Sequence, residues 1–145
     1  MLFVFVDIGT LPRKFFAGLG NMPMSNEHQG AEMHSDRVHI RANEAVKKLL
    51  EDAKERSAMM YTHGTLMVKV YAPRENDPQT PHTRDEIYVI INGTGSFFNG
   101  VERKPFGPGD FLFAPAGSVH RFEDFSNDFL TWVMYFGPEG GETPG

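Results

Sequence analysis

Short apolar runs separated by turn residues fill the chain from Ala58 onward, and they predict a protein built of β-strands. The runs have the length and the β-branched and aromatic content that strands favour, and they cover residues 58–61, 66–72, 86–91, 95–98, 101–104, 111–114, 119–123 and 129–136. The dipeptides Asn92-Gly93 and Asn99-Gly100 are typical of two-residue hairpin turns. About eight short antiparallel strands favour a sandwich or a barrel.

A helical period precedes the strands, between Asn43 and Arg56. Apolar residues recur there at steps of three and four, with charged residues between them, which is the pattern of an amphipathic helix. These apolar residues are Val46, Leu49, Leu50 and Ala53. Asn43 suits the position of the N-cap, and Glu44 suits the first turn. We expect this helix to pack across the outside or one end of the barrel.

Residues 1–36 have no sustained period, and their Gly, Pro, Asn and Ser content predicts loop or disorder. The alternative for residues 2–6 is an added edge strand exchanged between subunits, because this apolar run has strong β propensity. A start at Met24 or Met33 is a further alternative, in which the preceding stretch does not belong to the native protein. We therefore divide the chain into an N-terminal extension, residues 1–36, and one domain, residues 37–145.

Composition narrows the class of protein. A chain of 145 residues suffices for one domain with a sizeable core, and the 40% hydrophobic content fits a packed globule. The net charge of -5 argues against nucleic-acid binding. The apolar start is too short for a secretory signal or a membrane span, so no membrane partner is expected. The absence of cysteine excludes disulfides, zinc–thiolate sites and cysteine nucleophiles, and a cytoplasmic location is the simplest interpretation.

Two histidine-containing segments, residues 80–93 and 109–124, indicate a metal site. In an extended strand, residues at even offsets share a face, so His82 and Glu86 are expected to project the same way. His120 follows directly after the Pro and Gly turn at residues 115–118. If the two strands are neighbours, two imidazoles and one carboxylate converge. That ligand set is typical of non-haem iron, and other divalent metals also accept it.

The two segments resemble the paired motifs of the cupin superfamily. In the first motif, His82 stands four residues before Glu86, and Gly93 follows after six residues. In the second, the family's Gly, Pro, Gly and His positions are matched, and Asp124 stands where Asn is usual. The matching residues are Gly109, Pro115, Gly117 and His120. Thr80 replaces the first histidine of the family, and strand parity points the neighbouring Gln79 to the opposite face unless a bulge intervenes.

The resemblance implies an all-β fold, an antiparallel cupin β-barrel or double-stranded jelly roll, with the short amphipathic helix on its N-terminal side. It also implies a divalent metal, iron, manganese, nickel or zinc, held by His82, Glu86 and His120. The first hypothesis is an enzyme of the dioxygenase or isomerase type acting on a small polar or aromatic molecule, and a homodimer is expected by resemblance. The alternatives are a non-catalytic binding or sensing module, or a degenerate site whose histidines only form hydrogen bonds. No general base is visible beyond the ligands, which disfavours an isomerase.

Several further residues are candidates for the pocket. Tyr88 shares parity with Glu86, and Phe122 shares parity with His120, although either aromatic residue also fits an ordinary core. The other candidates are Thr80, Trp132, which faces inward or stacks on a partner, and Asp124, which orients His120 or serves as a turn residue. Lys69 and Arg84 are cations near the barrel mouth that suit either an anionic substrate or the surface. Surface positions are expected for His28, His34, His39 and His63.

Overall fold

The computed structural model describes residues 39–51 and 56–143, which form eight strands and one helix with their connecting segments. The elements are α1 (Ala42–Glu51), β1 (Ser57–His63), β2 (Leu66–Tyr71), β3 (Asp85–Asn92), β4 (Gly95–Phe98), β5 (Arg103–Phe106), β6 (Phe111–Ala114), β7 (Arg121–Glu123) and β8 (Leu130–Phe136). The predicted all-β fold with one short preceding helix is confirmed. The predicted extension, its edge strand at residues 2–6 and the end of the helix lie outside the described residues.

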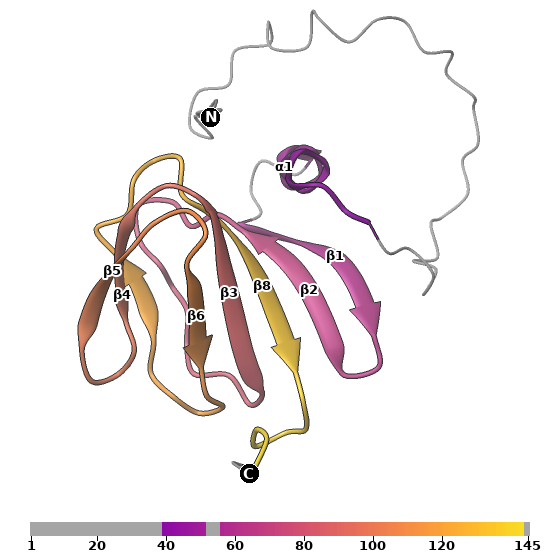
Figure 1. Ribbon diagram of the computed structural model, residues 1–145, viewed down its shortest axis with the longest axis vertical. Helices are drawn as coiled ribbons and strands as arrows, with labels where there is room; N and C mark the ends of the chain where they lie inside the picture. The colour runs from indigo at the N-terminus through magenta and orange to yellow at the C-terminus, as the bar shows by residue number, and fades with distance from the viewer. Residues whose placement is uncertain (1–38, 52–55, 144–145) are drawn as a thin grey trace, which may run out of the picture.

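The strands form two antiparallel sheets that face each other. One sheet has five strands in the order β1-β2-β8-β3-β6, and the other has three in the order β5-β4-β7 (Figure 1). Strands distant in sequence are neighbours in both sheets, because β8 lies between β2 and β3 and β7 pairs with β4. The interior between the sheets therefore receives side chains from both halves of the chain.

The turn at Asn92-Gly93 is not the hairpin that the sequence predicted. β3 pairs with β6 and β8, whereas β4 pairs with β5 and β7, so this turn carries the chain from one sheet to the other. Gly93 has a φ of 84°, and a Cβ atom there would lie 2.5 Å from the Cα atom of Phe129. Only glycine permits this crossing. The second turn, at Asn99-Gly100, does join two paired strands, β4 and β5.

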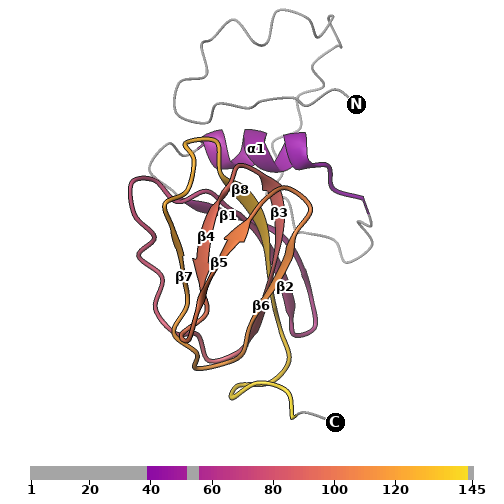
Figure 2. The same cartoon turned by 60° about the vertical axis from the view of Figure 1, so that its left-hand side comes forward.

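Helix α1 lies across one end of the molecule, opposite the end from which the C terminus leaves (Figure 2). The amide of Arg41 donates a hydrogen bond to a carboxylate oxygen of Glu44 (3.1 Å), so Arg41 takes the N-cap position. The prediction of Asn43 as the cap is therefore wrong. Ala45 and Leu49 are buried against the outer face of β1 and β2. The helix has 10 residues, and no helix in the described ranges is long and apolar enough to cross a membrane.

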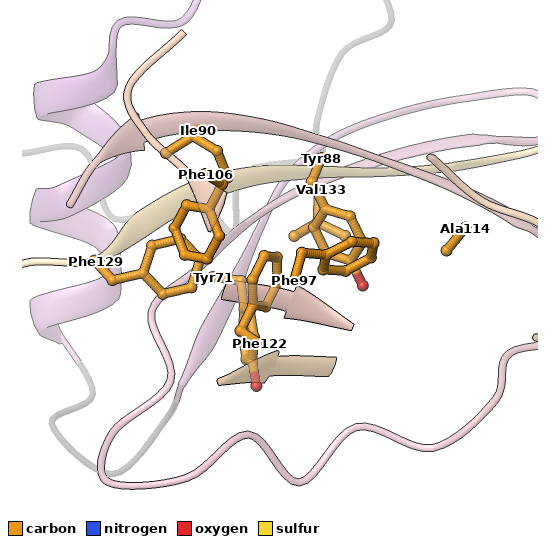
Figure 3. Packing of buried hydrophobic residues seen from close by; sticks show 9 residues of the cluster. All are labelled: Tyr71, Tyr88, Ile90, Phe97, Phe106, Ala114, Phe122, Phe129 and Val133. Carbon is orange, nitrogen blue, oxygen red and sulfur yellow. The ribbon is translucent and has the colours of Figure 1, made fainter. Parts of the chain in front are cut away.

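The aromatic core fills the space between the sheets. Figure 3 shows Phe106 and Phe129 towards the helix and Ala114 towards the opposite side. Tyr88, Phe122 and Phe129 are fully buried and contact one another or shared neighbours at ring separations of 4.6–5.7 Å. Each such ring contributes about 2–3 kcal/mol by leaving water. The apolar packing therefore concentrates at the helix end, and polar side chains occupy the other end.

Candidate metal centre

Three ionisable side chains, His82, Glu86 and His120, meet at the polar end of the interior. Their ligand atoms lie within 4.8 Å of one another. Glu86 projects from the inner face of β3, while His120 directly precedes β7 in the opposite sheet. The two strands face each other and are not hydrogen-bonded neighbours as the sequence argument supposed. His82 lies outside any strand, because β3 begins at Asp85.

The polar atoms of this cluster are close together but poorly satisfied. Nε2 of His82 and Nε2 of His120 each lie 3.0 Å from Oε2 of Glu86. These contacts are close approaches and not aligned hydrogen bonds, since neither Glu86 oxygen nor Nε2 of His120 has a hydrogen-bond partner of adequate geometry. The Glu86 side chain is 0% exposed and that of His120 is 2% exposed. A buried carboxylate without hydrogen bonds destabilises the fold unless a cation binds next to it.

The tautomer of His120 is set by its backbone neighbour. Nδ1 of His120 lies 3.0 Å from the carbonyl oxygen of Ser118, which can only accept, so Nδ1 carries a proton. Nε2 then turns its lone pair towards Oε2 of Glu86. Burial lowers the pKa of His120, but the contact and charge of Glu86 outweigh burial and raise the pKa overall. Below this raised pKa a proton lies between the two atoms, and a bound metal ion would take its place.

His82 forms the solvent-facing side of the cluster, with 21% of its side chain exposed. Burial lowers its pKa more than the charge of Glu86 raises it, so its imidazole is held neutral, as a metal ligand requires. The hydroxyl of Tyr135 and Oε1 of Gln79 each lie 3.4 Å from its Nε2. Shallow hollows flank His82, so a small molecule has access to the cluster from this side.

Buried Asp85 ties together the loops that present the ligands. Its two carboxylate oxygens accept hydrogen bonds from the amides of Ala116 (2.9 Å) and Glu142 (2.8 Å). The amide of Gly117 donates to the carbonyl of His82 at 2.7 Å, which links the two ligand loops directly. Asp85 belongs to neither set of candidate residues predicted from the sequence. Its position at the start of a buried strand, beside a candidate ligand, was the available signal.

Gln79, and not Thr80, lies at the site. Oε1 of Gln79 accepts a hydrogen bond from the hydroxyl of Tyr88 (2.7 Å), and its Nε2 donates to Asp77 (2.8 Å). Thr80 is exposed. The parity argument that turned Gln79 away was wrong because the segment preceding β3 is not a strand. Pro78 and Pro81, which flank the two residues, were the sequence signal for irregular backbone.

Of the other pocket candidates, two lie in the interior and two lie outside it. Tyr88 and Phe122 belong to the interior core cluster, and the ring of Tyr88 lies 6.0 Å from that of His120. Trp132 packs on the outer face with the residues beneath α1, so its assignment to the pocket is wrong. Asp124 is exposed with a φ of 49°, so the turn alternative holds and His120 is oriented by Ser118 instead.

Tyr135 is a site residue that the sequence analysis missed. It projects from the inner face of β8, where Glu86 is its partner across the ladder. Its ring meets that of His82 edge-on, with centroids 5.1 Å apart. Burial raises the pKa of Tyr135 and of Tyr88, and the charge of Glu86 raises both further. Both phenols are therefore protonated at neutral pH.

The cluster fits a divalent metal ion. Two imidazole nitrogens and a carboxylate oxygen are ligands that iron, manganese, nickel and zinc accept. The hydrogen bond of Nδ1 of His120 to a carbonyl is the outer contact expected of a metal-bound histidine. The unsatisfied oxygens of Glu86 supply the negative charge that such an ion requires.

Comparison with known proteins agrees with the fold and the motifs. Residues 67–136 match the cupin domain family. The chain belongs to the cupin superfamily. A cupin-2 domain protein from Shewanella frigidimarina has the same fold, with 14% identity and a TM-score of 0.54, over 68% of this cupin and 94% of the other chain.

Two other relatives match part of this cupin. An uncharacterised protein from Streptomyces coelicolor is 33% identical over 63 residues, which are 43% of this chain and 60% of the relative. The DMSP lyase DddQ from Ruegeria pomeroyi DSS-3 is 27% identical with a TM-score of 0.50, over 56% of this chain and 46% of the lyase. This cupin therefore spans less than two thirds of the length of these relatives.

Proposed function

We propose that this cupin is a metal-dependent enzyme acting on a small polar molecule, with His82, Glu86 and His120 as the metal ligands. The observation that carries the proposal is the convergence of three donor atoms, two of them on fully or almost fully buried side chains, without aligned hydrogen bonds for Glu86 or for Nε2 of His120. A divalent ion of iron, manganese, nickel or zinc would supply Lewis acidity towards a substrate oxygen. Two imidazoles and one carboxylate leave coordination positions for that substrate.

A tyrosine at the site supports chemistry in which a proton moves. The hydroxyl of Tyr135 lies 3.4 Å from Nε2 of His82, whereas the single hydroxyl proton of Tyr88 is already donated to Gln79. Because burial keeps the Tyr135 phenol protonated, its hydroxyl is a hydrogen-bond or proton donor to a substrate oxygen that gains negative charge. Tyr135 thus supplies an acid that the two sequence motifs lack. It favours a lyase or an isomerase, and the likeness to a DMSP lyase supports the same class.

Two other functions have specific support. The ligand set is the one used by non-haem iron oxygenases, which supports a dioxygenase acting on a small polar or aromatic molecule. The missing first histidine of the family motif, at Thr80, supports a non-catalytic module that binds or senses a small ligand.

Turnover of candidate substrates separates these functions. The chain is loaded with Fe²⁺ or Zn²⁺ and incubated with DMSP and a panel of small polar molecules, under nitrogen and under air, with products followed by proton NMR. A lyase or isomerase converts a substrate under nitrogen, and His120→Ala abolishes the conversion. Conversion only under air with Fe²⁺ indicates the dioxygenase. Tight binding of a panel member without conversion indicates the binding module and contradicts the proposal.

A further inference from the structure

We infer that Lys69 is the anion-binding residue of this site and that the substrate is a small carboxylic acid with one negative charge. The inference rests on the proposed function, because it takes a divalent ion as bound by the three candidate ligands. It adds the chemical class of the substrate and the residue that selects it.

Lys69 lies on the inner face of the five-stranded sheet. In the ladder it is paired with Val133 of β8, and Val133 is paired with Tyr88 of β3. Val133 and Tyr88 are both buried in the interior core. Residues opposite each other across a sheet point to the same face, so the side chain of Lys69 starts from the wall that also carries Glu86 and Tyr88.

The ammonium group of Lys69 lies close to the candidate metal centre. Its Nζ atom is 5.5 Å from the centroid of the Tyr135 ring, on the ring face. The ring of Tyr135 in turn contacts the ring of His82, with centroids 5.1 Å apart. The ring of Tyr135 thus lies between the positive charge of Lys69 and His82, the solvent-facing ligand.

Lys69 has no carboxylate partner within the part of the chain that the structure describes, although its side chain is partly buried. Both oxygens of Asp77, the nearby interior carboxylate, already accept hydrogen bonds, from Tyr71, Gln79 and the amide of Phe122. Glu86 faces the two imidazoles. With a divalent ion bound, Glu86 and Asp77 balance its charge, and the ammonium remains uncompensated. A singly charged anion completes the balance.

Arg84 is the other cation close to the site, and its guanidinium has a different role. It donates a hydrogen bond to the carbonyl oxygen of Thr65 at 2.7 Å, in the turn between β1 and β2. This contact ties the turn to the segment before β3. Arg84 also lines the hollow next to the candidate metal centre, so it is not a control. Lys104, exposed on β5 of the other sheet and paired with Glu102 at 2.7 Å, is the matched control for Lys69.

A hollow bounded by Tyr135, the ring over which the Lys69 ammonium lies, has room for such a substrate. It is lined by Met67, His82, Thr83, Arg84, Tyr135 and the exposed Glu139. A carboxylate at the ammonium and a second oxygen directed towards His82 would place a small hydroxy or oxo acid across the face of Tyr135. The charge of Glu139 is exposed to water and is screened there.

The test uses Co²⁺-loaded protein and the visible absorption of Co²⁺ as the signal. Glycolate, 3-hydroxypropanoate and 4-hydroxybutanoate are titrated beside their neutral amides and inorganic phosphate, in wild type, Lys69→Met and Lys104→Met. We expect at least one acid to bind wild type about tenfold to a hundredfold more tightly than its amide. Lys69→Met should remove that preference without changing the Co²⁺ stoichiometry, and Lys104→Met should keep it within about twofold.

Three results would overturn the inference while leaving the metal site intact. They are equal binding of acids and amides, an acid preference that survives Lys69→Met, and phosphate binding more tightly than every acid. An equal loss in Lys104→Met would show that Lys69 has no specific role and would overturn the inference as well. Failure of wild type to bind Co²⁺ contradicts the proposed function itself and removes the inference with it.

Discussion

Replacing Glu86 by glutamine should have opposite effects on the metal-free and metal-bound protein. At a pH above the raised pKa of His120 and without metal, the buried carboxylate lies against two neutral imidazoles and has no aligned hydrogen bond. Glutamine removes the charge, although its amide is still poorly satisfied. An unpaired buried charge costs several kcal/mol, and an unsatisfied neutral polar group costs about 1–3 kcal/mol. Glu86→Gln should therefore stabilise the metal-free protein by about 1–2 kcal/mol, or raise its Tm by about 4–8 °C.

The effect of Glu86→Gln on the stability of the metal-free protein should change with pH. The pKa of His120 is raised in the folded protein by Glu86, despite burial. Stability from the imidazolium–carboxylate pair is therefore present below the pKa of an unfolded histidine and is lost as the pH rises through the raised value. At acidic pH the wild-type pair is charged on both sides, so the advantage of Glu86→Gln should shrink or reverse.

With metal bound, wild type should be more stable than Glu86→Gln. A ligand at about a thousand times its Kd stabilises a folded protein by about 4 kcal/mol. A hundredfold loss of affinity in Glu86→Gln removes about 2.8 kcal/mol of that gain. Thermal unfolding with and without Zn²⁺ measures both differences, and Glu139→Gln, an exposed charge at the same end of the molecule, is the control with little expected change. An equal Zn²⁺-induced rise in Tm for wild type and Glu86→Gln would refute the reasoning.

Other substitutions and conditions test the site further. Gln79→His should raise Zn²⁺ affinity about tenfold, while Thr80→His should leave it unchanged because Thr80 is exposed. Calorimetric titration measures both affinities. A gain in Thr80→His and none in Gln79→His would mean that Thr80 takes the place of the missing histidine, as the sequence motif predicts. Asp85→Ala should lower the free energy of unfolding by about 2–3 kcal/mol in urea melts, since two buried backbone amides lose their acceptor; no loss would mean that Asp85 does not hold the two loops. Zn²⁺ affinity should fall with acidification first through the raised pKa of His120 and then through the lowered pKa of His82, and a flat profile between pH 5 and 8 would exclude both imidazoles.

The sequence predicted the motif residues well because their backbone is dictated locally. The turn at residues 115–118 needs its proline and glycine whatever surrounds it, and His120 follows at a fixed distance. The strand from Asp85 to Asn92 carries a long apolar run whose alternate residues must face one core. Glu86 and Tyr88 were therefore placed correctly on its inner face.

The wrong predictions concern residues whose positions depend on tertiary arrangement. Strand parity was applied to the irregular segment around Gln79, where it has no meaning. Trp132 was assigned to the pocket because the sequence does not reveal which face of β8 the helix covers. Tyr135 was missed for the same reason, since its role depends on pairing with Glu86 across strands far apart in sequence. The homodimer and the cytoplasmic location stay predictions.

X-ray absorption of the Zn²⁺-loaded chain tests the central claim most directly, because it reads the atoms around the ion. We predict one ion per chain with two imidazole nitrogens at about 2.0–2.1 Å and a carboxylate oxygen at about 2.0–2.2 Å, and loss of one imidazole in His120→Ala. A first shell without imidazole, or one unchanged by that substitution, would contradict a metal centre formed by His82, Glu86 and His120.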